Sequence, residues 1–210
     1  MRKWCRKCMA SLCTVTIAFS GMYIVGNEST KTVKADGEYQ LVWSDEFDGT
    51  ELNRNNWNVE VNGNGGGNNE LQYYVDNTKN LEVSNGTLKI HALRENYGNK
   101  SYTSGRINSK GKQEFKYGKI EARMKLPRFS GIWPAFWTLG ANYDTVGWPK
   151  CGEMDIMEAI NDNNTVFANL HWSYKNSQAD TKGKTYDVGD RTQWHTYGME
   201  WDENSAAFYV

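Results

Sequence analysis

Three carboxylates lie close together in residues 151–159, which read CGEMDIMEA. Glu153, Asp155 and Glu158 stand there among apolar residues typical of a buried element. Burying a carboxylate is costly unless it has a partner or a task, so this segment is the strongest candidate for chemistry. The spacing alone also fits an amphipathic helix or an exposed strand with solvated acids.

In a regular strand Glu153 and Asp155 face one side and Glu158 faces the other. A β-bulge at Ile156 and Met157 would return Glu158 to the side of the other two. The two glutamates would then be about 13 Å apart at Cα, a gap their side chains can close to the ~5–5.5 Å of a retaining glycosidase pair. In such a pair one carboxylate attacks the anomeric carbon and the other protonates the leaving oxygen. Asp155 is shorter and is expected to tune the ionisation of a neighbour.

Tryptophans gather near the acidic segment. Trp133 and Trp137 stand in WPAFW, and Trp148 follows in GWP. Indole rings stack on the C–H faces of sugar rings, which predicts a groove for a neutral polysaccharide, although ordinary core packing is the alternative for any one of them. Trp133 and Trp137 have the same parity, so we expect them on one face of a strand.

A further segment, residues 166–172, places Asn169 and His171 on one face of the next expected strand. A single histidine is more often structural, and this one has no second His or Cys at metal-ligand spacing, which disfavours zinc. The sequence contains no serine nucleophile elbow, P-loop or dinucleotide fingerprint.

Short apolar-alternating segments separated by Gly and Asn are expected to position these groups. They predict an all-β, antiparallel sandwich or barrel without a convincing helix. Residues 119–126 show the period of two clearly, with Ile120 and Met124 on the expected core face. The expected strands are 39–43, 81–83, 87–93, 118–126, 135–139, 153–159, 166–172, 194–201 and 206–210.

The chain has 210 residues, 39% of them hydrophobic and 23% charged, which suits one packed domain. Its net charge is −1, and no basic stripe alternates with aromatics, so nucleic acid is not an expected partner. The chain is expected to end within a strand, at 206–210, and thus to lack the last strands of its domain.

Residues 1–35 have the layout of a secretory signal peptide: basic residues, an apolar stretch and a small-residue cleavage region. A transmembrane anchor is the alternative, but Thr and Ser dilute the apolar run. Cleavage near Ala35 would remove six of 24 basic and one of 25 acidic residues, leaving six acidic groups in excess. Cys151 would be the remaining cysteine, so no internal disulfide is expected.

Several blocks of the sequence resemble the family 16 glycoside hydrolases, in particular their laminarinase-like endo-β-1,3-glucanases. The acidic block has the form E-x-D-x-x-E, and a W-P-A-x-W block precedes it. The other matching blocks are WSDEFD at 43–48, NNELQYY at 68–74, YGKIEAR at 117–123 and HTY with EW at 195–201. The resemblance implies a concanavalin-like β-jelly-roll with a concave substrate cleft, formed by a catalytic domain over residues 36–210.

The resemblance also implies roles for individual residues. Glu153 would be the nucleophile, Asp155 its helper and Glu158 the acid/base. The residues that would bind sugar are Arg106, Asn69, Trp133, Trp137 and His171, with Asn169 and Trp148 as further candidates. No cofactor is expected for catalysis. A structural Ca²⁺ is implied on the convex side, with carbonyl oxygens near Glu46 and Gly86, at a site that lacks an Asp from the missing strands.

The function that follows is a secreted, monomeric, retaining endo-glycosidase that hydrolyses β-1,3 bonds of β-glucans and is free of the membrane after leader cleavage. The acidic strand with its extra residue, Met157, resembles the bulged strand of laminarinases, whereas lichenases resemble the same strand without that residue. This favours β-1,3-glucan over mixed-linkage glucan as the substrate. The alternatives are a lichenase-type β-1,3-1,4-glucanase, a transglycosylase of the same fold and a non-catalytic β-glucan-binding lectin.

Overall fold

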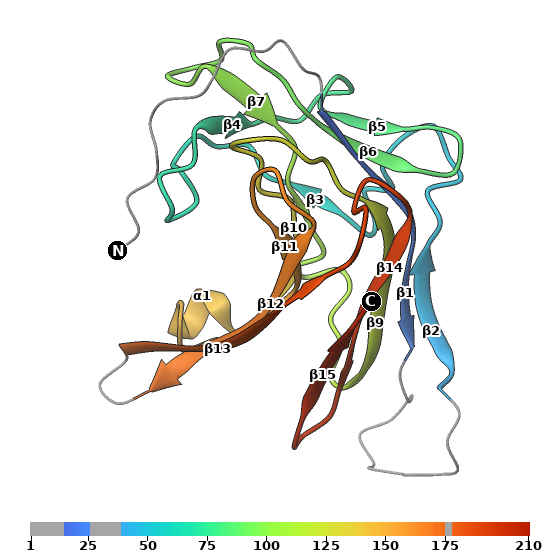
Figure 1. Ribbon diagram of the computed structural model, residues 1–210, viewed down its shortest axis with the longest axis vertical. Helices are drawn as coiled ribbons and strands as arrows, with labels where there is room; N and C mark the ends of the chain where they lie inside the picture. The colour runs from blue at the N-terminus through green and yellow to red at the C-terminus, as the bar shows by residue number, and fades with distance from the viewer. Residues whose placement is uncertain (1–14, 26–38, 175–177) are drawn as a thin grey trace.

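A computed structural model describes residues 15–25, 39–174 and 178–210, and their regular secondary structure is almost entirely β (Figure 1). The strands of the larger sheet are β1 (Val15–Val25), β2 (Leu41–Asp45), β5 (Leu81–Val83), β6 (Leu88–Ala92), β9 (Gly118–Lys125), β14 (His195–Trp201) and β15 (Ala206–Tyr209). Their order is β15-β14-β9-β1-β6-β5, with β2 also paired to β1, and all pairs are antiparallel.

The second sheet has four antiparallel strands in chain order. They are β10 (Ala135–Leu139), β11 (Glu153–Ala159), β12 (Thr165–Tyr174) and β13 (Gln178–Asp187). Two short pairs lie outside both sheets, β3 (Asn58–Val59) with β8 (Ile107–Asn108) and β4 (Gln72–Tyr74) with β7 (Tyr102–Ser104). The single turn α1 (Tyr143–Val146) buries no side chain. Among the described residues, no helix has the length and hydropathy needed to cross a membrane.

The hydrophobic core joins the two sheets. Met124 of β9 and Met199 of β14 belong to one buried cluster with Met157 of β11 and Val166 of β12, and all four side chains are 0% exposed. The predicted alternation along β9 is confirmed, since Ile120, Ala122, Met124 and Leu126 are all buried. Because one face of the four-stranded sheet is occupied by this core, its other face is available for a substrate. The all-β sandwich is therefore confirmed.

Besides β1, which lies in the predicted leader, five strands of the described residues were not predicted from the sequence. Strands β3, β4, β7 and β8 have two or three residues each. The alternation of WNVEVN at 57–62 around β3 was a signal that the prediction overlooked, whereas β4, β7 and β8 are too short to show a period of two. Strand β13 has ten residues, but its sequence QADTKGKTYD has no apolar alternation, because nine of its side chains are exposed. It is held by its antiparallel pairing to the full length of β12.

Strand β1 lies inside the segment that the sequence predicts to be a cleaved leader. It pairs with β6 on one side and with β9 on the other, so it is a central strand of the larger sheet. A mature protein without residues 1–35 would have to fill this position with another strand or leave the facing edges of β6 and β9 unpaired. The rest of the predicted leader lies outside the described residues.

Candidate active site

Strand β11 carries the three acidic residues and contains the predicted bulge. Asp155 pairs with Asn169 of β12, whereas Glu158 pairs with Phe167, so three steps along β11 match two along β12. The pairing of β11 with β10 shows a corresponding irregularity. One extra residue is therefore accommodated between Asp155 and Glu158.

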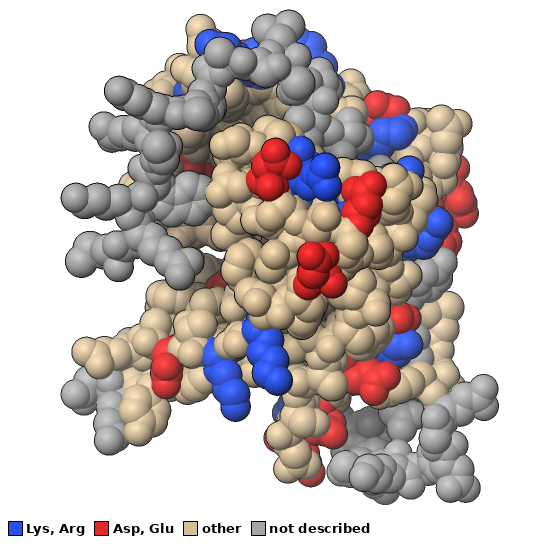
Figure 2. Space-filling view, in the orientation of Figure 1, with Lys and Arg blue, Asp and Glu red and all other residues tan. Residues whose placement is uncertain are grey.

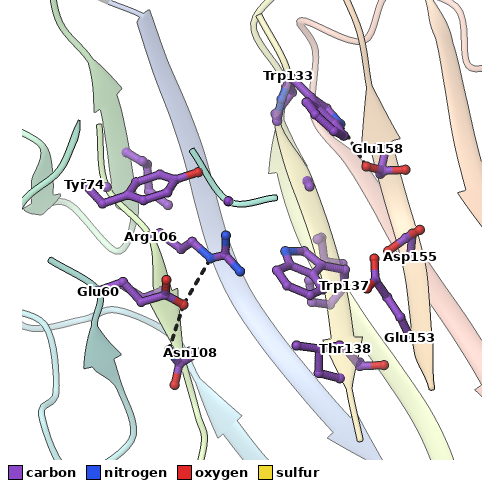
Figure 3. A pocket seen from close by; sticks show the side chains of 18 of the residues that line it. Glu60, Tyr74, Arg106, Asn108, Trp133, Trp137, Thr138, Glu153, Asp155 and Glu158 are labelled. Atoms are coloured by element: carbon purple, nitrogen blue, oxygen red, sulfur yellow. Dashed lines mark hydrogen bonds and ion pairs between the residues drawn. The ribbon is translucent and has the colours of Figure 1, made fainter. Parts of the chain in front are cut away.

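The extra residue changes which side chains enter the core. Ile156 and Met157 are consecutive, yet they are 2% and 0% exposed and belong to the same core cluster. Glu153, Asp155 and Glu158 line a wide groove on the other face of β11 (Figure 3). The prediction that the bulge brings all three acids to one surface is confirmed.

Glu158 is held by two hydrogen-bond donors. Trp133 Nε1 donates to Oε1 at 2.8 Å, and Asn169 Nδ2 donates to Oε2 at 2.9 Å. Burial raises the pKa of Glu158, and the two hydrogen bonds oppose that rise because they stabilise the carboxylate. A fixed carboxyl group with a raised pKa has the properties that a general acid/base requires.

The argument that placed Trp133 by strand parity was wrong. Strand β10 begins at Ala135, so Trp133 lies in the segment before it and has no strand face. Both Trp133 and Trp137 nevertheless line the groove, and the indole of Trp133 reaches Glu158 from there (Figure 3).

Asp155 lies between the two glutamates and is only 2% exposed. Its Oδ2 is 3.0 Å from His171 Nε2, and His171 Nδ1 is in turn 2.6 Å from Thr181 Oγ1. Burial, followed by the negative charges of Glu158 and Glu153, raises the pKa of Asp155 to about 8. The raised pKa favours the protonated form of Asp155, in which its contact with His171 is a hydrogen bond and not an ion pair.

This proton makes stability depend on pH in a testable way. In the unfolded chain Asp155 ionises near its ordinary pKa of 3.8, but in the folded protein it does so near 8. The folded state thus binds more protons between these values, so this group lowers stability as pH rises from about 4 to 8. We expect Asp155→Asn to raise the unfolding midpoint by about 4 °C or more at pH 8 and by less at pH 5, measured by calorimetry. An equal change at both pH values would contradict the assigned proton.

Glu153, Asp155 and His171 also form the one cluster among the described residues that could offer three ligands to a metal ion. Their ligand atoms all lie within 4.8 Å of one another. However, Asp155 shares a hydrogen bond with Glu153, and its raised pKa makes a proton the natural occupant at neutral pH. The cluster is explained by proton sharing between acids that cannot all be ionised together.

Arg106 contacts Trp137 of β10, the strand paired with β11, from across the groove. Its Nε lies 3.1 Å from Glu60 Oε1, and its Cζ lies 4.8 Å from the ring centre of Trp137 and 5.7 Å from that of Tyr74 (Figure 3). The guanidinium thus connects the β3–β8 pair to strand β10 by side chains. A sugar ring that contacts Trp137 must do so on the indole surface that Arg106 leaves free.

The other predicted binding residues lie around the same groove. Asn69 lines the groove from the Gly/Asn-rich loop of residues 62–69, where its backbone has φ = +57°. His171 lines the groove beside Asp155. Asn169 does not line the groove but supports Glu158 from β12. Trp148 is 49% exposed and lies outside the groove lining, with its ring 6.3 Å from that of His171. Gly140 allows its loop to close, since a Cβ there would collide with the carbonyl oxygen of Cys151.

Sequence reasoning missed three residues that act on the site, Glu60, Tyr74 and Thr181. Glu60 pairs with Arg106, Tyr74 lies near that guanidinium, and Thr181 contacts His171. Tyr74 does stand in the NNELQYY block, which could have drawn attention to it. Glu60 stands in WNVEVN at 57–62, whose strict apolar/polar alternation is a strand signal that could have drawn attention to it. Thr181 stands in a polar segment, and only the pairing of β13 with β12 brings it to His171.

The visible surface carries no strong field of one sign. Figure 2 shows acidic and basic side chains interspersed over this face, with most of the area formed by uncharged residues. The groove itself is lined largely by aromatic, apolar and amide side chains, and besides the three acids it carries charged side chains of both signs, such as Glu70 and Lys110. Such a lining suits a neutral, hydroxyl-rich ligand.

Comparison with known proteins identifies the family. The sequence profile of the glycosyl hydrolases family 16 matches residues 67–210, which include Glu153, Asp155 and Glu158. The chain belongs to this family. The catalytic domain of an endo-1,3-beta-glucanase (laminarinase) from Thermotoga petrophila has a similar structure, with a TM-score of 0.75 and 42% sequence identity, over 82% of this chain and 73% of that one.

Two curated relatives of this family 16 chain are similar over most of its length. The clotting factor G alpha subunit of Tachypleus tridentatus is 41% identical over 183 residues, covering 82% of this chain and 25% of that protein. The beta-glucanase of Rhodothermus marinus is 38% identical over 179 residues, covering 82% of this chain and 63% of that protein. The chain thus spans less than two thirds of the length of these relatives.

Proposed function

We propose that this family 16 chain is a retaining endo-β-1,3-glucanase that hydrolyses internal bonds of laminarin-type β-glucans. The observation that carries the proposal is the bulged strand β11, which brings Glu153, Asp155 and Glu158 to one groove. The similarity to a laminarinase domain supports β-1,3-glucan as the substrate. A lectin would need the tryptophan-lined groove but not three acids arranged along it.

In the first step the Glu153 carboxylate attacks the anomeric carbon, and the bond from that carbon to the leaving oxygen breaks. The Glu158 carboxyl group gives its proton to that oxygen, so the leaving chain departs as an alcohol. Trp133 and Asn169 fix the carboxyl group in the orientation this transfer needs. Asp155 contributes its hydrogen bond to Glu153, which orients that carboxylate and stabilises its charge when the glycosyl group leaves it.

In the second step Glu158, now a carboxylate, removes a proton from water, and the water oxygen attacks the anomeric carbon of the glycosyl-enzyme. The bond to Glu153 breaks, which releases its carboxylate and a sugar of the original anomeric configuration. A transglycosylase would use the same groups but admit a sugar hydroxyl in place of water. Longer products in the presence of acceptor oligosaccharides would identify that activity.

The direct test is release of reducing sugar from laminarin beside lichenan, with agarose and carrageenan as controls. We expect faster release from laminarin than from lichenan and none from the two controls. Faster release from lichenan would assign the mixed-linkage activity instead. Binding of laminarin without any release would support the lectin.

Trp133→Phe tests the hydrogen bond to Glu158. The phenyl ring keeps an aromatic surface but loses the N–H donor that holds the pKa of Glu158 down. The pKa of Glu158 should therefore rise further, and the alkaline limb of the kcat/KM profile should move to higher pH, because the acid stays protonated longer. An unchanged or lowered limb, measured with a laminari-oligosaccharide, would argue against Glu158 as the acid.

We also propose a structural Ca²⁺ on the convex side. The loop after β2 and the turn at residues 84–87 lie close together, since Asp48 Oδ1 is 3.8 Å from the Cβ position of Gly86. Carbonyl oxygens near Glu46 and Gly86, with a carboxylate nearby, are donors of the kind that Ca²⁺ takes. The ion would stabilise the fold and take no part in the reaction.

The remaining parts of the proposal concern the whole protein. In this proposal residues 1–35 act as a secretory leader, and after cleavage another strand takes the place of β1 between β6 and β9. The domain of residues 36–210 works outside the cell as a monomer and needs no cofactor for catalysis. Secretion suits an enzyme whose substrate is a polymer too large to enter a cell. The mass of the secreted protein would show whether cleavage occurs near Ala35.

A further inference from the structure

Strand β13 is the edge of the four-stranded sheet and is exposed along almost its whole length. It contributes no acid and no aromatic ring to the groove. It does lie directly beside β12, whose Asn169 and His171 contact the catalytic acids. The pairing places Thr181 opposite His171 and Gly183 opposite Asn169.

The side chain of Asn169 occupies space that any other residue at position 183 would fill. A Cβ built on Gly183 would overlap Asn169 Oδ1, would lie 3.0 Å from Asn169 Cγ and would lie 2.8 Å from the carbonyl oxygen of Ala168. Real Cβ atoms essentially never approach other atoms so closely. Gly183 has no positive φ, so its missing side chain, not its backbone freedom, is what the structure uses.

The absence of a side chain at position 183 leaves room for the side chain of Asn169. Its Nδ2 donates to Glu158 Oε2 at 2.9 Å, and it also stabilises the ionised form of Asp155. The other groups acting on Glu158 are the Trp133 donor and the charges of Glu153 and His171. None of these groups lies on β13, and Asn169 is the one among them that a Cβ at position 183 would meet. We therefore expect a change at Gly183 to act on Glu158 through Asn169.

We propose that Gly183 is a positioning residue for the acid/base, because it leaves the room in which Asn169 can donate a hydrogen bond to Glu158. The neighbouring pair on the same two strands works in a parallel manner, since Thr181 Oγ1 holds His171 Nδ1 at 2.6 Å. The exposed edge strand β13 thus positions Asn169 and His171 of β12, which in turn contact the acids of β11. This inference rests on the proposed function only for its effect on rate.

The experiment compares Gly183→Ala, Asn169→Ala and the double variant with wild type. The titration of Glu158 is followed by NMR of its side-chain carboxyl carbon, a measurement that requires no activity. The signal is assigned by its loss in Glu158→Gln. Gly49→Ala is the matched control, because a Cβ there meets nothing closer than 3.6 Å. Thermal unfolding of each variant is recorded alongside.

We expect the pKa of Glu158 to rise in Gly183→Ala and in Asn169→Ala, because each loses the same hydrogen bond, and to rise no further in the double variant. With laminarin as substrate, kcat/KM should fall by about ten-fold or more in both single variants. Gly49→Ala should match wild type in all readouts.

Two results would overturn the role of Gly183. One is an unchanged Glu158 titration in Gly183→Ala. The other is an additional shift or a loss of folding when Gly183→Ala is added to Asn169→Ala, since the effect would then not pass through Asn169. Absence of laminarin cleavage by wild type would overturn the proposed function but leave the NMR comparison able to decide this inference.

Discussion

Glu153→Gln should reduce kcat on laminarin by about 10³-fold or more, since the amide cannot form the glycosyl-enzyme. The amide has the shape of the carboxyl group, so the variant should still bind a laminari-oligosaccharide, with a Kd close to that of the wild-type enzyme for the same oligosaccharide. Initial rates and calorimetric binding would measure the two effects separately.

The control for Glu153→Gln is Glu203→Gln, which makes the same chemical change at an exposed position far along the chain. It should leave both rate and binding unchanged. If Glu153→Gln kept near-full activity, Glu153 would not be the nucleophile, and the assignment of the whole strand would be wrong.

Glu158→Gln should reduce kcat on laminarin by about 10²–10⁴-fold, because a poor leaving group needs the proton that this residue supplies. An aryl glycoside with an acidic phenol needs no such proton to leave. On that substrate the first step should stay fast, so a burst of phenol should precede slow turnover, and added azide should speed the second step.

The leaving-group dependence separates the two glutamates. Glu153→Gln should slow the first step on both substrates, whereas Glu158→Gln should slow the first step only on laminarin. An equal loss of the first-step rate on both substrates in Glu158→Gln would mean that the residue supports the fold or the binding of sugar and does not transfer a proton.

The bulged geometry of β11 could be predicted from the sequence, because the chemistry requires the three acids on one face and their spacing permits this only with one extra residue. Three acids could serve one groove only if Ile156 and Met157 formed a bulge, and both side chains are buried in the core. The alternation of β9 and the apolar runs of β5 and β10 likewise predicted strands, since each has a buried and a less buried face.

Contacts that depend on pairing over long sequence distances could not be predicted. Strand β13 is fixed by β12, not by its own apolar residues, so Gly183 and Thr181 carried no signal. Glu60 meets Arg106 only because β3 pairs with β8, which lies 48 residues or more further along the chain. Trp133 reaches Glu158 from an irregular segment to which strand parity does not apply.

The central claim is that Glu153 and Glu158 perform a double displacement on a β-1,3-glucan. The most direct test follows the digestion of a laminari-oligosaccharide by proton NMR and identifies the anomer formed first. The account predicts the β-anomer, with the α-anomer appearing later by mutarotation. The α-anomer as first product would contradict it, because a single displacement by water inverts the configuration.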